Sequence, residues 1–152
     1  MKTEFYDTLN RQVLAIFEGE TDLIAGMANL SALLNENLEG INWVGFYIKR
    51  GDELVLGPFQ GKLACVRIPL GRGVCGTAAS ENVTQRIADV HQFEGHIACD
   101  SASNSEIVIP VRQNNQVVAV LDIDSPNFDR FDQADQQGLE TIVNSFEKCL
   151  LG

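Results

Sequence analysis

The feature that most constrains this chain is a change of apolar periodicity between its ends and its middle. Apolar residues recur at steps of three and four over residues 5–17 and 23–38, which predicts two amphipathic helices at the N-terminal end. The same spacing over residues 139–150 predicts a closing helix, with Asp132 as its N-cap. The chain should therefore begin and end in helices that each bury one face.

The middle of the chain is typical of short strands. Residues 43–48 are aromatic and β-branched, and a turn leads from them into residues 53–56. Residues 107–111 and 117–123 are the strongest strand predictions. Residues 113–116, Gln-Asn-Asn-Gln, should form the hairpin turn between them, because Asn tolerates the positive φ that such turns require.

Together these patterns predict an α+β domain in which an antiparallel sheet carries the terminal helices on one face. A chain of 152 residues with 45% hydrophobic residues is long and apolar enough for a proper core. We therefore expect a single domain over residues 1–152.

The charge balance excludes several classes of partner. The chain has 11 basic and 21 acidic residues, a net charge of −10, and its Lys and Arg are not clustered. This argues against nucleic acid and against an anionic membrane surface. No apolar run reaches the length of about 20 residues that a membrane span needs, and acids stand where a signal peptide would be apolar. A cytoplasmic location is expected.

The segment 66–105 is a long connection, and such connections in small domains usually carry the site. Within it, residues 71–76 match the dinucleotide pattern G-x-G-x-x-G. Pro69 interrupts the strand that this pattern needs before it, and Asp89 comes too early for the ribose acid. The glycines are therefore interpreted as forming a tight loop, which a short helix-like segment over residues 77–81 follows.

Cysteines are the chemically active candidates of the chain. None of them forms a C-x-x-C pair, so neither a zinc site nor any other metal site is predicted. Cys99 has polar neighbours, and a thiolate there could be stabilised by nearby His96 and act as a nucleophile. Cys149 lies on the apolar face of the last helix, where most cysteines are inert. The roles of His91 and His96 are left open. The four cysteines are Cys65, Cys75, Cys99 and Cys149.

Acidic residues on an apolar strand are the second unusual feature. Asp122 and Asp124 are two residues apart, so both should point to the same face. They repel one another unless an ammonium group or a proton lies between them, and Glu106 on the partner strand could join them. Such carboxylates could orient an amino group while one of them protonates a leaving oxygen. Which one carries that proton is left open.

Six short motifs follow one another along the chain at residues 42–47, 56–61, 73–76, 95–100, 103–108 and 121–125. In this order they resemble the free methionine-R-sulfoxide reductases, which are single-domain GAF proteins. The resemblance implies an antiparallel GAF sheet with the terminal helices on one side and a ligand pocket on the other. It also implies a substrate, free L-methionine-(R)-S-oxide, and a reaction without a cofactor.

The roles of individual site residues are inferred only from their positions in the motifs of this family. By resemblance, the catalytic cysteine is Cys99, its main resolving partner is Cys65, and Cys75 is an accessory cysteine. The family's acidic and aromatic pocket residues also have matches, whereas Cys149 lies outside every motif. The matching acidic residues are Glu106, Asp122 and Asp124, and the matching aromatic residues are Trp43 and Tyr47.

The resemblance and the residues predict one chemistry. The Cys99 thiolate would attack the sulfoxide sulfur, a protonated carboxyl would supply the oxygen's proton, and Cys99 would become a sulfenic acid. A second thiol would convert it to a disulfide, and a thioredoxin-type reductant would restore the enzyme. Two alternatives are a GAF sensor that only binds a small molecule and a Cys65–Cys99 redox switch without a substrate. Oligomeric state, including a homodimer, is left open.

Overall fold

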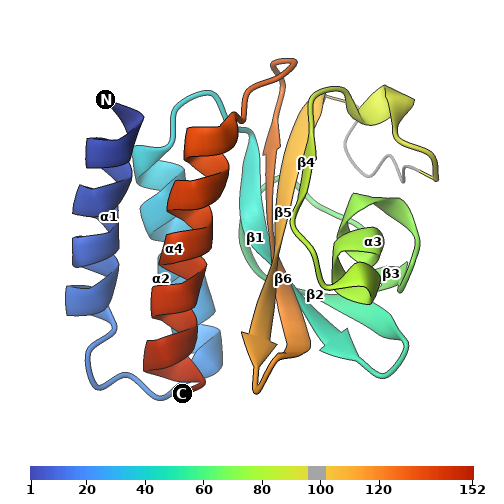
Figure 1. Ribbon diagram of the computed structural model, residues 1–152. Coiled ribbons are helices and arrows are strands. Elements are labelled where there is room, and N and C mark those ends of the chain that lie inside the picture. Colours follow the sequence, from blue (N-terminus) through green and yellow to red (C-terminus); the bar gives the residue numbers. More distant parts are fainter. Residues whose placement is uncertain (96–101) are drawn as a thin grey trace.

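The computed structural model describes residues 1–95 and 102–152. Within these residues the chain follows the expected order of two helices, a run of strands and a closing helix (Figure 1). The elements are α1 (Lys2–Ile16), α2 (Leu23–Asn37), β1 (Trp43–Arg50), β2 (Glu53–Gly61), β3 (Arg67–Pro69), α3 (Gly73–Glu81), β4 (Gln85–Ile87), the short 3₁₀ helix η1 (Val90–Gln92), β5 (Ser105–Gln113), β6 (Gln116–Ser125) and α4 (Gln133–Leu150).

The strands of the described residues form one sheet in the order β3-β2-β1-β6-β5-β4. Every neighbouring pair is antiparallel. Figure 1 shows α1, α2 and α4 on one side of this sheet and α3 on the other. The predicted α+β architecture with the terminal helices on one face is therefore confirmed. None of the helices in the described parts of the chain is long and apolar enough to cross a membrane.

The main core lies between the sheet and the helices α2 and α4, and α1 packs outside them against α4. Alternate residues of β1, β5 and β6 point into it, as Phe46 does from β1 and Leu121 from β6. Burying a side chain of this size stabilises the fold by about 1.5–3 kcal/mol, so this face carries most of the stability. The other residues of the same strands are left for the opposite face.

The two terminal helices are joined by a buried polar contact. Asp132 is the N-cap of α4 as predicted, and its side chain forms a reciprocal capping box with Asp135. The Tyr6 hydroxyl donates to Asp135 Oδ1 at 2.7 Å. Spacing predicts Phe5 as part of the buried face of α1, but Phe5 is 38% exposed and Tyr6 is buried. Leu9, Val13 and Phe17 are buried as the spacing predicts, so α1 departs from the predicted face only in its first turn.

The tight turns form where Asn and Gly were expected to allow them. Asn114 and Asn115 have φ values of +53° and +64°, which makes the predicted hairpin turn between β5 and β6. Gly71 and Gly73 also have positive φ, so the start of the glycine-rich segment is a tight loop as predicted, whereas its remainder forms the first turn of α3. A Cβ on Gly76 would lie only 2.5 Å from the carbonyl oxygen of Pro69.

The helix that follows this loop is longer than its sequence indicates. Helical character is predicted only from Thr77, whereas α3 begins at Gly73. Two glycines in its first turn lower its intrinsic propensity, and packing against the sheet overrides this. The helix therefore places Val74 and Cys75 against the second face of the sheet, in a smaller apolar cluster.

Candidate active site

The face of the sheet opposite the terminal helices carries the predicted acidic residues. In the register of β1 and β6, Gly45 is opposite Asp122 and Trp43 is opposite Asp124. In the register of β5 and β6, Glu106 is opposite Asp124. The three carboxylates therefore share one face, as the alternation of the strands predicts.

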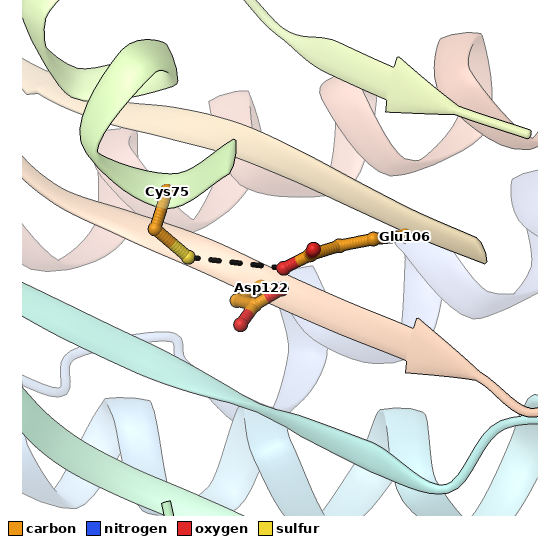
Figure 2. A group of neighbouring side chains, drawn as sticks. All are labelled: Cys75, Glu106 and Asp122. Carbon is orange, nitrogen blue, oxygen red and sulfur yellow. Dashed lines mark hydrogen bonds between the residues drawn. The ribbon is translucent and has the colours of Figure 1, made fainter. Parts of the chain in front are cut away.

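Two of these carboxylates meet a thiol. Cys75 reaches down from α3, and its Sγ lies 3.9 Å from Glu106 Oε2, as Figure 2 shows. Ligand-type atoms of Cys75, Glu106 and Asp122 all lie within 4.8 Å of one another. The three residues are only 4%, 8% and 5% exposed. Asp122 Oδ1 is buried and has no hydrogen-bond partner among the described residues.

Burial and crowding favour the protonated form of these acids. Burial raises the pKa of Glu106 well above its ordinary value, and the nearby charges of Asp122 and Asp124 raise it further. Burial also raises the pKa of Asp122, although hydrogen bonds from its neighbours oppose that rise. The carboxyls titrate together, so a proton stays on the group at a higher pH than on an exposed acid.

The same surroundings keep Cys75 as a thiol. Burial raises the pKa of the Cys75 thiol well above its usual range, and the charges of Asp122 and Glu106 raise it further. Because the thiolate is the nucleophile, a thiol in this position is a poor one. It acts instead as a hydrogen-bond donor to Glu106.

Aromatic rings form a wall beside the acids. The Trp43 ring stacks on Phe59 at a centroid distance of 5.1 Å and on Tyr47 at 6.0 Å. Trp43 and Tyr47 are buried and tied at their polar ends: indole Nε1 donates to the carbonyl of Lys62 at 3.1 Å, and the Tyr47 hydroxyl donates to that of Cys65 at 2.8 Å. Burial, and then the charge of Asp122, raise the pKa of Tyr47, so its hydroxyl stays protonated.

The remaining predicted residues lie in different places. Cys65 is half-buried in the connection between β2 and β3 and packs at the edge of the second apolar cluster. His91 is on η1, where its Nε2 lies 2.9 Å from Asn104 Oδ1. Cys149 packs against the main core, on the helix side of the sheet. Cys99 and His96 lie outside the described residues.

Two features of this face were not found from the sequence. Motif position gives Cys75 only an accessory role, yet its thiol contacts Glu106. Phe59 was not singled out, although it covers Trp43. Gly45 was a sequence signal for the close packing of Phe59, because a Cβ at residue 45 would lie 2.2 Å from Phe59 Cβ. Glycine within an aromatic strand marks such a close approach.

Comparison with known proteins agrees with this arrangement. The GAF domain family model matches residues 28–149. The chain is 62% identical to the free methionine-R-sulfoxide reductase of Escherichia coli (strain K12), over 98% of this chain and 90% of that protein. The chain belongs to the free methionine-R-sulfoxide reductases.

Solved structures of free methionine-R-sulfoxide reductases share the fold over nearly the whole chain. The structure of fRMsr of Staphylococcus aureus in complex with substrate is 56% identical, with a TM-score of 0.92 and coverage of 95% of each chain. The free methionine-R-sulfoxide reductase from Neisseria meningitidis in complex with its substrate is 43% identical, with a TM-score of 0.93. The match covers 98% of this chain and 90% of the Neisseria meningitidis chain. The fold prediction of an antiparallel GAF sheet is therefore confirmed.

Proposed function

We propose that this chain reduces free methionine-(R)-sulfoxide to methionine, with Cys99 as the nucleophile. Membership of the free methionine-R-sulfoxide reductases supports the reaction, and the motif position of Cys99 supports the residue. The observation that supports it most is the buried carboxyl pair Glu106 and Asp122, because sulfoxide reduction needs a proton on the departing oxygen.

In the first step, the Cys99 thiolate attacks the sulfoxide sulfur while a carboxyl of the cluster protonates the oxygen. The bond between methionine sulfur and oxygen breaks, and the oxygen with its proton ends on the cysteine sulfur. Two electrons pass from the cysteine to methionine sulfur, so the products are methionine and Cys99 sulfenic acid. The raised pKa of Glu106 and of Asp122 suits these carboxyls to hold the required proton.

In the second step, the Cys65 thiol attacks the sulfenic acid, a disulfide forms and water leaves. A thioredoxin-type dithiol then reduces the disulfide by exchange and is itself oxidised. Cys65 is the better resolving thiol because it is half-buried in a loop, whereas Cys75 is fully buried among acids that raise its pKa. Cys75 keeps the accessory role of its motif, holding Glu106 through its hydrogen bond.

Substrate selection follows from the same face of the sheet. Trp43 and Tyr47 offer apolar ring surface to the methyl and methylene groups of methionine sulfoxide and exclude water. The carboxylates offer a negative counter-charge to the free α-ammonium, with Asp124 available once another acid holds the proton. A methionine sulfoxide whose amine is acylated lacks that charge, so it should be refused.

The test is methionine formation from the separated R and S sulfoxides of free methionine, with dithiothreitol as reductant. We expect turnover of the R form only, no turnover of N-acetyl-methionine sulfoxide, and complete loss in Cys99→Ser. Cys149→Ser is the matched control and should keep full activity, because Cys149 packs on the opposite face of the sheet. No turnover of either isomer by folded, reduced protein would favour the ligand-binding sensor instead.

A further inference from the structure

The cluster of Cys75, Glu106 and Asp122 combines a sulfur and carboxylate oxygens from three different elements, α3, β5 and β6 (Figure 2). We propose that the reduced protein binds Zn²⁺ through these three side chains and that the bound metal inhibits turnover. The binding stands on the geometry alone, whereas the inhibition rests on the proposed function. No spacing motif could indicate this site, because the fold and not the local sequence brings the ligands together.

Distances within the cluster are close to those that zinc requires. A Zn–S distance of about 2.3 Å and a Zn–O distance of about 2.1 Å at a tetrahedral angle place sulfur and oxygen about 3.6 Å apart. Cys75 Sγ and Glu106 Oε2 are 3.9 Å apart, and all three ligand-type atoms lie within 4.8 Å of one another. No pair of ligand atoms would have to approach by more than about 1.4 Å to close the site.

A second observation points to a missing cation. Asp122 Oδ1 is buried without a hydrogen-bond partner, and the Asp122 residue is only 5% exposed. None of the ion pairs among the described residues involves Asp122 or Glu106. A buried carboxylate oxygen without a partner is costly, and a bound cation would supply what this one lacks.

The donor set selects the metal. A thiolate is a soft ligand that suits zinc and disfavours Mg²⁺ and Ca²⁺, which take oxygen ligands only. Three protein ligands held by a helix and two strands leave a fourth position for water or a ligand, which is the pattern of an open zinc site.

Zinc in this position would prevent the proposed proton transfer. A carboxylate that coordinates the metal has lost its proton, because metal ligands must be deprotonated. Neither Glu106 nor Asp122 could then protonate the sulfoxide oxygen. The expected effect is reversible inhibition of methionine formation that a chelator relieves.

Binding is measured first, on the full-length, reduced and metal-free protein. Zn²⁺ is titrated in competition with a chromophoric chelator, for the wild type, Cys75→Ser, Glu106→Gln and the control Cys149→Ser. We expect the wild type and Cys149→Ser to bind Zn²⁺ tightly. The affinity for Zn²⁺ should be about 100-fold lower or more in Cys75→Ser and Glu106→Gln. Retention of wild-type affinity by Cys75→Ser, or absence of tight binding in the wild type, would overturn the proposal. Unfolding curves show whether a weak variant is folded, and Glu106→Gln tests the site independently.

Co²⁺ substitution identifies the ligand directly. A thiolate-to-cobalt charge-transfer band should appear in wild type and Cys149→Ser and be absent in Cys75→Ser. Turnover with and without Zn²⁺ separates the two proposals. Zinc binding in a protein that turns over no sulfoxide refutes only the proposed function. Turnover without any zinc binding refutes only the metal site.

Discussion

Replacing Glu106 by glutamine tests the buried acids of the site, because the change removes a titrating group and keeps the size of the side chain. Glu106 is 8% exposed, receives the Cys75 thiol at 3.9 Å, and joins no ion pair among the described residues. Glutamine can still accept that hydrogen bond, so the loss is confined to charge and proton. A general acid contributes about 10²–10⁴-fold to a rate, equivalent to about 3–5 kcal/mol of barrier.

We therefore expect kcat/KM for free methionine-(R)-sulfoxide to fall by about 10²–10⁴-fold in Glu106→Gln. The same substitution should favour stability, measured as the free energy of unfolding relative to the wild type, as pH rises. Because folding raises the pKa of Glu106 above its ordinary 4.5, the wild type is favoured below that value and loses this contribution as pH rises through the folded pKa. Glutamine does not titrate, so the variant should gain on the wild type as pH increases.

The assay pairs steady-state kinetics with urea unfolding at several pH values, and Glu36→Gln on the exposed surface of α2 is the control. That control should change neither property. Because Glu106 and Asp122 titrate together, Asp122→Asn is measured alongside. Turnover within threefold of wild type in both variants would refute the assignment of the proton to this cluster. A Glu106→Gln variant that loses stability relative to wild type with rising pH would refute the electrostatic reasoning.

Three further substitutions are tested by urea unfolding, two beside the site and one between the terminal helices. Gly45→Ala should cost about 1–3 kcal/mol, because its Cβ would lie 2.2 Å from Phe59 Cβ; an unchanged midpoint would contradict that contact. Tyr47→Phe should cost about 1 kcal/mol through the lost hydroxyl donor, and equal stability would mean that the bond contributes nothing. Tyr6→Phe should cost about 2 kcal/mol, because the bond to Asp135 at 2.7 Å involves a buried charged acceptor. A loss below 0.5 kcal/mol would show that Asp135 is satisfied without it.

Local rules of sequence were enough for much of the fold. Helical spacing located the terminal helices, Asp132 was recognised as a cap, and consecutive asparagines predicted the hairpin turn. Alternation along a strand placed Asp122 and Asp124 on one face, and the register shows that they are. Each of these inferences needs only neighbours within a few residues, so the sequence could support it.

What the sequence could not show depends on contacts between distant segments. Cys75 approaches Glu106 because α3 packs on the second face of the sheet, and no periodicity of the sequence indicates that packing. The burial of Tyr6 in place of Phe5 accompanies a hydrogen bond to Asp135, near the other end of the chain. Propensity also failed at α3, where packing extends the helix through glycine positions.

The strands β5 and β6 serve both faces at once, and this has a practical consequence for preparing the protein. Glu106 and Ile107 are neighbours, yet one belongs to the acid cluster and the other to the main core; Asp122 and Ile123 divide in the same way. If the pairing of these strands shifted by one residue, the carboxylates would point into the main core beneath the helices. The isoleucines would then point to the opposite face, where the candidate site lies. Such a molecule would be both unstable and inactive. The specific activity of a sample should therefore be proportional to the fraction of correctly paired chains, because mispaired chains would contribute no activity.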